Sequence, residues 1–261
     1  MSNPGKIKAL LQRHVLLRTP DPGSFEAAIP GISLHRRDTV NSPENCLYLP
    51  RIVKLIQGRK RTVVGNDEYF YDEDGIFIAG VDFPNTSSIF KASLKNPCMS
   101  ISIDLDKELI AQLPREMSGS LTNDDDEGNG LQVQSAVPKT LYAFLLLMEL
   151  LDRPEQIPVM GPMLIKEIHY RVLMGTGGER LRLFYTFGSR RNLVARAITW
   201  LRENFAERVT VEELADKVHM ASSTFYRRFK ETGTVSPLQF QKRLQLHEAH
   251  RLMLTENMES L

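Results

Sequence analysis

Four polar residues near the C-terminus share one stripe of an expected helix. Side chains spaced 0, +3, +4 and +7 lie on a single helical face, and the residues with this spacing are Ser223, Tyr226, Arg227 and Lys230. Phe225 and Phe229, one turn apart, are expected to face the interior and to turn this stripe toward solvent. Such a helix can carry hydrogen-bonding groups into the major groove of DNA, which is wide enough to admit it.

The side chains on and beside this stripe divide into two kinds of DNA contact. Arg227 can donate two hydrogen bonds to guanine O6 and N7, the Ser223 hydroxyl can donate or accept, and Tyr226 can contact a thymine methyl group or a phosphate. Arg228 and Lys230 are better suited to phosphates, and such contacts add affinity without sequence information. The sequence therefore predicts DNA-binding residues at Ser223, Tyr226, Arg227, Arg228 and Lys230.

The segments before this helix indicate a helix-turn-helix. Thr210-Val-Glu-Glu213 fits a capping box, in which the threonine hydroxyl accepts the glutamate amide and the glutamate carboxylate returns to the cap amide. Ala215 is small enough to let two helices approach closely, and His219-Met220 supplies a tight turn between them. An ordinary helical bundle with one polar face is the alternative interpretation of the same spacing.

Two further helices are expected around this pair, one over residues 191–205 and one that begins at Ser236-Pro237, a favoured helix start. The second is expected to run to Leu254 with these residues inside: Phe240, Leu244, Leu246, Ala249, Leu252 and Met253. Residues 190–254 hold twelve Lys and Arg against seven Asp and Glu, although the whole chain has a net charge of only +1. This local excess of positive charge favours a polyanionic partner.

Residues 31–105 are predicted to form short β-strands separated by turns. Gly65-Asn-Asp67 is a hairpin signal, and Asp72-Glu-Asp-Gly75 is a second turn before the strand Ile76-Phe-Ile-Ala79. Residues Met99 to Leu105 alternate between apolar and polar types, as in a strand that is buried on one face only. Closely spaced strands of this length are typical of a sandwich or a small barrel.

A polar stretch separates these strands from a helical region. Residues 114–137 contain Gly, Ser, Asn and the run Asp124-Asp-Asp-Glu127, so they are expected to form a mobile loop rather than an acidic metal site. Helical periodicity returns over residues 138–185, where apolar residues of Leu141–Leu151 occupy most sides of one helix. Either the β-rich part or a second copy of the chain must cover that helix.

Other chemistry has less support. Cys46 and Cys98 lack metal-ligand spacing and are expected to be free thiols, with sensing of an oxidant or electrophile as the alternative. The strands from Cys46 to Leu105 contain no histidine and His35 precedes them alone, whereas a metal-dependent cupin enzyme needs two or three histidines with a carboxylate. No metal or cofactor is expected. Because the sequence has neither a membrane-spanning apolar stretch nor a signal-peptide pattern, a cytoplasmic protein without membrane contact is expected.

In combination, several segments resemble the AraC/XylS family of bacterial transcription regulators. Four C-terminal segments resemble the first half of the family's DNA-binding domain: Val211–Ala215, Met220–Lys230, Ser236–Leu244 and Leu246–Leu254. Six others resemble the cupin-like sensor domain of one branch of the family: Gln57–Lys60, Tyr69–Asp72, Val81–Pro84, Asp104–Asp106, Leu151–Glu155 and Ile168–Leu173. The resemblance covers nearly the whole chain from Gly31 onward.

The resemblance implies an α+β fold in four parts. These are a cupin-like double-stranded β-helix sensor over 1–113, the acidic loop over 114–137, a helical segment over 138–185 and a partial all-α DNA-binding domain over 190–261. Two local departures are Ala221, where the family's recognition helix usually has a serine cap, and Gly233-Thr234, which reverses the family's order. Family members carry a second helix-turn-helix after the connecting helix, and this sequence ends at Leu261, where that unit should begin.

The function implied is regulated binding of double-stranded promoter DNA. An unidentified small-molecule or reactive effector would act at the N-terminal domain, with Cys46 and Cys98 as candidate thiols. A homodimer through residues 141–151 and contact with RNA polymerase are the other expected partners. A single helix-turn-helix makes few contacts, so weak operator binding is expected unless dimerisation adds avidity. The alternatives are an interaction partner that dimerises without gripping DNA and, with least support, a cupin enzyme.

Overall fold

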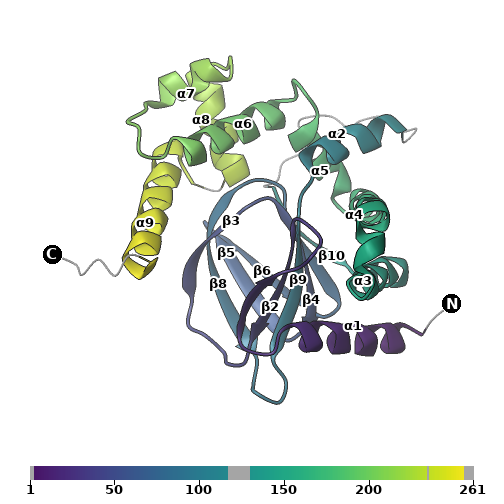
Figure 1. The fold of residues 1–261 in the computed structure, drawn as a ribbon. Helices are drawn as coiled ribbons and strands as arrows, with labels where there is room; N and C mark the ends of the chain where they lie inside the picture. The colour runs from purple at the N-terminus through teal and green to yellow at the C-terminus, as the bar shows by residue number, and fades with distance from the viewer. Residues whose placement is uncertain (1–2, 117–129, 234, 256–261) are drawn as a thin grey trace.

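The computed structural model describes residues 3–116, 130–233 and 235–255 of the chain. In Figure 1 the strands form the centre of the molecule, one group of helices lies along their side and the C-terminal helices lie at another. The α+β class expected from the sequence is confirmed. No helix within these ranges has the length and apolar content that a bilayer crossing requires.

Two antiparallel sheets make up the β-rich part. The larger sheet has six strands in the order β1 (Gly23–Glu26), β2 (Ile32–Arg37), β9 (Cys98–Asp104), β4 (Arg51–Gln57), β7 (Gly75–Ala79) and β10 (Leu131–Ser135). The smaller has four in the order β3 (Glu44–Tyr48), β8 (Phe83–Lys91), β5 (Arg59–Val64) and β6 (Asp67–Asp72). Val64 pairs with Asp67 across Gly65, whose φ is 61°, so the expected hairpin is confirmed.

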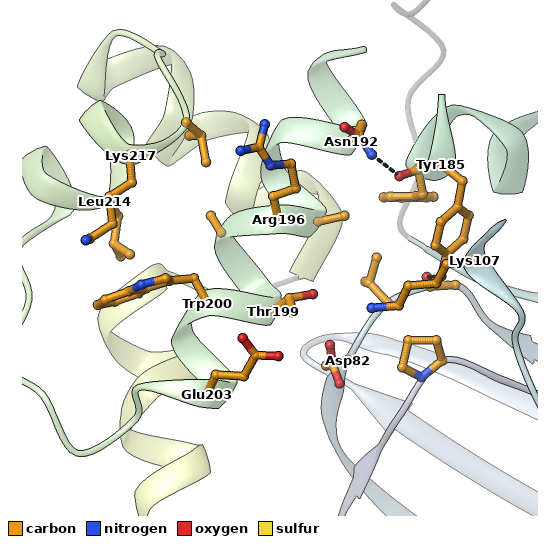
Figure 2. A pocket seen from close by; sticks show the side chains of 17 residues that line it. Asp82, Lys107, Tyr185, Asn192, Arg196, Thr199, Trp200, Glu203, Leu214 and Lys217 are labelled. Atoms are coloured by element: carbon orange, nitrogen blue, oxygen red, sulfur yellow. Dashed lines mark hydrogen bonds between the residues drawn. The ribbon is translucent and has the colours of Figure 1, made fainter. Parts of the chain in front are cut away.

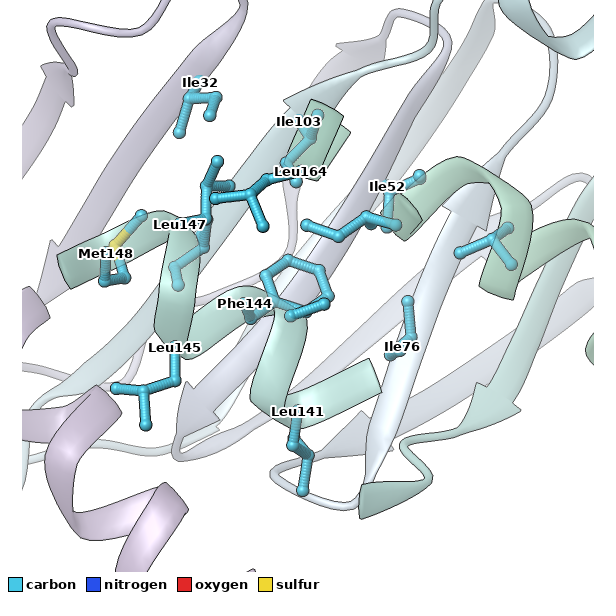
Figure 3. Packing of buried hydrophobic residues seen from close by; sticks show 14 of the residues in the cluster. Ile32, Ile52, Ile76, Ile103, Leu141, Phe144, Leu145, Leu147, Met148 and Leu164 are labelled. Atoms are coloured by element: carbon cyan, nitrogen blue, oxygen red, sulfur yellow. The ribbon is translucent and has the colours of Figure 1, made fainter. Parts of the chain in front are cut away.

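Three helices cover the outer face of the larger sheet: α1 (Pro4–Arg18), α3 (Pro138–Leu150) and α4 (Ile157–Leu173), the last preceded by the short 3-10 helix η1 (Pro154–Gln156). Figure 3 shows Phe144 and Leu147 of α3 among the isoleucines of the sheet. The larger sheet and the neighbouring helices of the same chain therefore cover the apolar side chains on most sides of Leu141–Leu151. Tyr142, 45% exposed, is the one large apolar side chain on that stretch with an exposed surface, so little of the stretch is left for contact with a second copy of the chain.

The structure differs from the sequence-based prediction in two places, one predicted as a loop and one predicted as a strand buried on one face. The sequence predicts a loop over residues 114–137, but α2 (Lys107–Glu116) ends inside this stretch and β10 occupies its end, paired with β7. The acidic run Asp124–Glu127 lies outside the described residues. Strand β9 is buried on both faces rather than one, because Met99 and Ile101 pack under the helices while Cys98 and Ser100 face the other sheet.

The C-terminal helices are α5 (Gly178–Tyr185), α6 (Arg190–Glu203), α7 (Val211–Lys217), α8 (Ser222–Gly233) and α9 (Pro237–Thr255). Phe240 and Leu244 of α9 are buried as expected, but Leu246 is 61% exposed, Met253 is 46% exposed and Ala249 is exposed as well. Their predicted inward placement is therefore wrong. Beyond Leu244 the helix leaves the helical core and passes beside β3 and β8, where a cavity lies between them.

The capping box at the start of α7 is confirmed. The Thr210 hydroxyl accepts the Glu213 amide at 3.2 Å, and Glu213 Oε2 accepts the Thr210 amide at 2.7 Å, which also holds the pKa of the Glu213 carboxyl below its usual value. Replacing Thr210 with alanine should lower the free energy of unfolding by about 1 kcal/mol, because the Glu213 amide loses the hydroxyl that accepts its hydrogen bond. Urea unfolding followed by circular dichroism measures this. Thr210→Ser should unfold like the parent, and an equal loss in both variants would contradict the assigned role of the hydroxyl.

Candidate nucleic-acid interface and interdomain cavities

Helices α7 and α8 form a helix-turn-helix. The turn between them closes through the Met220 amide, which donates to the Ala215 carbonyl at 2.9 Å, and through His219, whose φ of 55° lies in the left-handed region. Leu214 and Ala215 are fully buried, and the small alanine lets the two helices approach. The expected pairing of a capped helix with a second short helix is confirmed.

Two phenylalanines fix the orientation of α8. Phe225 and Phe229 have no exposed surface, and their ring centroids lie 5.6 Å apart. Phe229 also meets Phe240 of α9 edge to face at 5.6 Å, a favourable geometry for aromatic rings. Because these side chains point inward, the remaining face of α8 must point outward.

The polar stripe of α8 lies on the surface. Ser223 and Lys230 are exposed, Tyr226 is 43% exposed and the Arg227 side chain is 62% exposed. This orientation is what a DNA contact requires, and the contact itself stays a prediction. Arg227 Nη1 lies 3.7 Å from Glu231 Oε1, one turn along the helix. Such an exposed pair is weak, so it leaves Arg227 able to exchange its carboxylate for a base.

Arg228 is placed differently from the other four predicted residues. Its side chain is only 13% exposed, and its Nη1 donates to Glu231 Oε2 at 3.2 Å. A phosphate contact by Arg228 would need the side chain to leave this position. The sequence could not show this, because residue spacing places Arg228 at the edge of the stripe but does not reveal its pairing.

Contacts that sequence reasoning missed hold the Gly80–Asp82 corner of the sensor against α5 and, through Arg202, against α6 of the helix-turn-helix unit. Tyr185 of α5 donates its hydroxyl hydrogen bond to the Gly80 carbonyl at 2.5 Å, and burial raises the pKa of this phenol above its usual value. A side chain at Gly80 would collide with Leu181, whose Cδ1 lies 2.9 Å from the Cβ position. Arg202 of α6 reaches Asp82 at 3.4 Å. These residues lie about a hundred positions apart in the sequence, so no local pattern marks them.

A cavity of about 490 Å³ lies at this junction (Figure 2). One wall comes from the corner before β8, with Asp82, and from Lys107 at the start of α2. The opposite wall comes from α6, with Arg196 and Trp200, and from α7. The cavity therefore touches both the β-rich part and the unit that carries the polar stripe.

A second cavity, of about 1020 Å³, lies between the smaller sheet and α9. Its apolar surface comes from Leu47 and Val63 on strands and from Leu246 and Met253 on the helix. The basic side chains of α9 on its wall are Arg243, His247 and His250. The cavity explains why the apolar residues at the end of α9 are exposed, because they line an open space rather than a core.

The two cysteines are free thiols with different positions. Cys46 is half-buried and lines the second cavity, whereas Cys98 is buried inside the β-rich part. Burial raises the pKa of both thiols, which lowers the fraction of reactive thiolate. Their role as sensing thiols stays a prediction, and the position of Cys46 is the more suitable of the two.

His35 has a local structural role. Its Nδ1 is 2.9 Å from Ser24 Oγ and its Nε2 is 2.8 Å from Ser102 Oγ, so both ring nitrogens are engaged. Burial, with Lys60 and Arg51 nearby, lowers the pKa of this imidazole to about 3. Among the residues that the structure describes, no three His, Cys, Asp or Glu side chains gather as metal ligands.

Comparisons with known proteins agree with this architecture. Residues 28–180, more than half of the chain, match the family described as the N-terminus of AraC-type transcriptional regulators. Residues 201–242 match the bacterial regulatory helix-turn-helix proteins of the AraC family. No match was found among curated protein sequences.

Similar folds occur among solved structures. The unsaturated fatty acid-bound ToxT from Vibrio cholerae strain SCE256 has a TM-score of 0.60 at 10% identity, over 87% of this chain and 82% of that one. The AraC-like transcriptional activator CuxR has a TM-score of 0.34 at 13% identity, over 86% of this chain and 79% of that one. The ToxT likeness supports the fold, and the two family matches place both halves of the chain. The chain therefore belongs to the AraC family of bacterial transcription regulators.

Proposed function

We propose that the chain binds promoter DNA through α8 and that a small molecule bound at the N-terminal domain controls this binding. The observation that carries the proposal is the outward stripe of Ser223, Tyr226, Arg227 and Lys230, held by two buried phenylalanines. Arg227 would read guanine, whereas Lys230 would contact a phosphate. A regulator of this kind would act in the cytoplasm, where promoter DNA is found.

The cavity beside α9 supports control by an amphipathic acidic effector. It combines apolar side chains from two sheet strands and α9 with basic side chains on the helix. ToxT, which shares the fold, has been solved with an unsaturated fatty acid. A fatty acid presents the same two chemistries, an apolar tail and a carboxylate. An effector in this position would contact the sensor and the connecting helix at once.

The assigned roles on α8 are tested by a salt-dependent titration with promoter fragments from upstream of neighbouring genes. Arg227→Ala should reduce discrimination between fragments by about 1–3 kcal/mol, because a bidentate base contact is lost. Lys230→Ala should weaken binding to all fragments alike and reduce the slope of log K against log salt by about 1, because one phosphate contact is lost.

The control is Lys139→Ala, which removes an exposed lysine of the same charge from α3 and should leave both quantities unchanged. Equal effects of the Arg227 and Lys230 variants would contradict the assigned roles. A chain that binds no fragment but pairs with a full-length family member would support the interaction-partner alternative. Homodimerisation and contact with RNA polymerase stay predictions, and the burial of Leu141–Leu151 gives no support to a dimer through that stretch.

A further inference from the structure

The cavity between the sensor and α6 has buried acceptors that the protein does not satisfy. Asp82 is 1% exposed, and its Oδ1 accepts no hydrogen bond from the residues that the structure describes, although Arg202 Nε lies 3.4 Å from it as an ion-pair partner. Asn192 donates to the Phe184 carbonyl at 2.9 Å, but its own Oδ1 also lacks a donor there. A buried acceptor without a hydrogen-bond donor destabilises the folded protein, so two of them on the wall of one cavity call for a ligand that donates.

The cavity also presents donors without partners. Lys107 and Arg196 are exposed at its walls and form no hydrogen bond or close ion pair with another described residue, although Lys107 is near enough to Asp82 for its charge to act to lower the pKa of that carboxyl. Lys217 is engaged elsewhere, since its Nζ lies 4.3 Å from the centre of the Trp200 ring. The cavity thus offers unsatisfied acceptors and free cations together. A ligand that carries only one sign of charge would leave one of these sets unused.

The acceptor side is the more deeply buried. Figure 2 shows Asp82 and Lys107 on one wall, facing Thr199 and Glu203 of α6 on the other. Arg202 approaches Asp82 at 3.4 Å and Glu203 at 3.2 Å, so one guanidinium serves two carboxylates. An ammonium group beside Asp82 would supply the donors that this shared arginine cannot.

We propose that this cavity binds a small zwitterion of the α-amino acid class. Its ammonium group would donate to Asp82, its carboxylate would accept from Arg196 with Lys107 beside it, and Asn192 would accept a further hydrogen bond. A volume of about 490 Å³ lies within the usual range of ligand pockets of about 300–1,000 Å³. The site is separate from the proposed effector cavity beside α9, and the inference goes beyond the proposed function.

Occupation of this cavity has a direct route to the DNA-binding helices. The ligand would touch the corner before β8 on one side and α6 and α7 on the other. Leu214 of α7 lines the cavity and belongs to the same buried cluster as Phe225 and Phe229 of α8. Bound zwitterion would therefore favour the docked arrangement of the sensor and the helix-turn-helix unit.

Trp200 makes binding directly measurable, because it is the only tryptophan of the chain and lies on the cavity wall. The full chain is titrated with each common L-amino acid singly, and Trp200 fluorescence and calorimetric heat are recorded without DNA. At least one amino acid should give a saturable change. Its N-acetyl derivative, without the ammonium group, and its amide, without the carboxylate, should each bind about tenfold more weakly or worse.

Two variants locate the site. Asp82→Asn and Arg196→Gln should each weaken binding of the same amino acid about tenfold or more, while Asp21→Asn, an exposed control away from the cavity, should not. Arg196 is exposed, so its variant tests the site even if Asp82→Asn fails to fold. A flat titration with every amino acid, equal binding of the N-acetyl derivative, or unchanged affinity in Arg196→Gln would each overturn the proposal. Promoter binding, measured separately, would be untouched by that failure.

Discussion

Replacing Phe229 with alanine is expected to destabilise the helix-turn-helix unit by about 3–5 kcal/mol, enough to unfold a unit of ordinary stability. Phe229 has no exposed surface and contacts two other aromatic rings at 5.6 Å, from Phe225 and Phe240. Alanine leaves a void between α8 and α9 that well-packed neighbours fill only in part. The aromatic pair energies are lost together with the buried area.

Urea unfolding with two probes measures this effect. Trp200 reports on α6, whereas circular dichroism reports on all helices and strands. The Trp200 transition should move to much lower urea in Phe229→Ala. Leu238→Ala removes an exposed side chain of α9, 51% accessible, and should leave the transition nearly unchanged. Similar midpoints for both variants would show that the three rings do not hold α8 in place, and the outward stripe would lose its structural basis.

The stability of the sensor is expected to depend on the protonation of Lys54. This side chain is 1% exposed on β4, and its Nζ donates to the carbonyl oxygens of Glu73 at 2.6 Å and Gly75 at 3.2 Å. Burial, followed by repulsion from Lys8, lowers the pKa of the Lys54 ammonium from 10.5 to about 8. The unfolded chain therefore holds a proton between pH 8 and 10.5 that the folded chain releases. Because the unfolded state binds more protons there, stability rises with pH across this window.

The comparison of the parent with Lys54→Met isolates this contribution, since other groups titrate alike in both chains. The difference in unfolding free energy between the two should change by about 3 kcal/mol between pH 7 and pH 10.5, in favour of the parent at high pH. Chemical unfolding across that range provides the measurement. Lys95→Met, at an exposed position, is the matched control and should show no such change. A difference that stays constant with pH would mean that water reaches the ammonium group.

Local features were predictable from the sequence because neighbouring residues determine them. The capping box at Thr210, the hairpin at Gly65 and the inward phenylalanines of α8 all depend on residues within one or two turns of each other. Strand β10 was not predicted, because Leu131–Ser135 becomes a strand only by pairing with β7, more than fifty residues earlier. The prediction for the end of α9 was wrong for a similar reason. The neighbouring sheet, rather than the periodicity of the helix itself, sets the environment of Leu246.

The candidate sites likewise include one that local sequence predicts and two that it does not. The polar stripe on α8 follows from helical spacing, and its surface position is confirmed. Neither cavity could be foreseen, because each lies between segments that are distant in the chain. The apolar helix Leu141–Leu151 left two explanations open in the sequence, and the structure resolves them by placing Phe144 and Leu147 against the larger sheet.

Because β10 and α3 follow the other strands of the sensor in the sequence, they determine where the chain can be cut into fragments. The larger sheet gains its last strand at Leu131–Ser135, and its outer face is closed by helices that end at Leu173. A fragment that stops at residue 113 would leave an unpaired strand edge and a bare row of isoleucines, and would be expected to aggregate. Chimaeras that exchange sensors between relatives should therefore be joined at Thr186–Ser189, between α5 and α6, where Phe187 is 88% exposed and Gly188 has a φ of 79°.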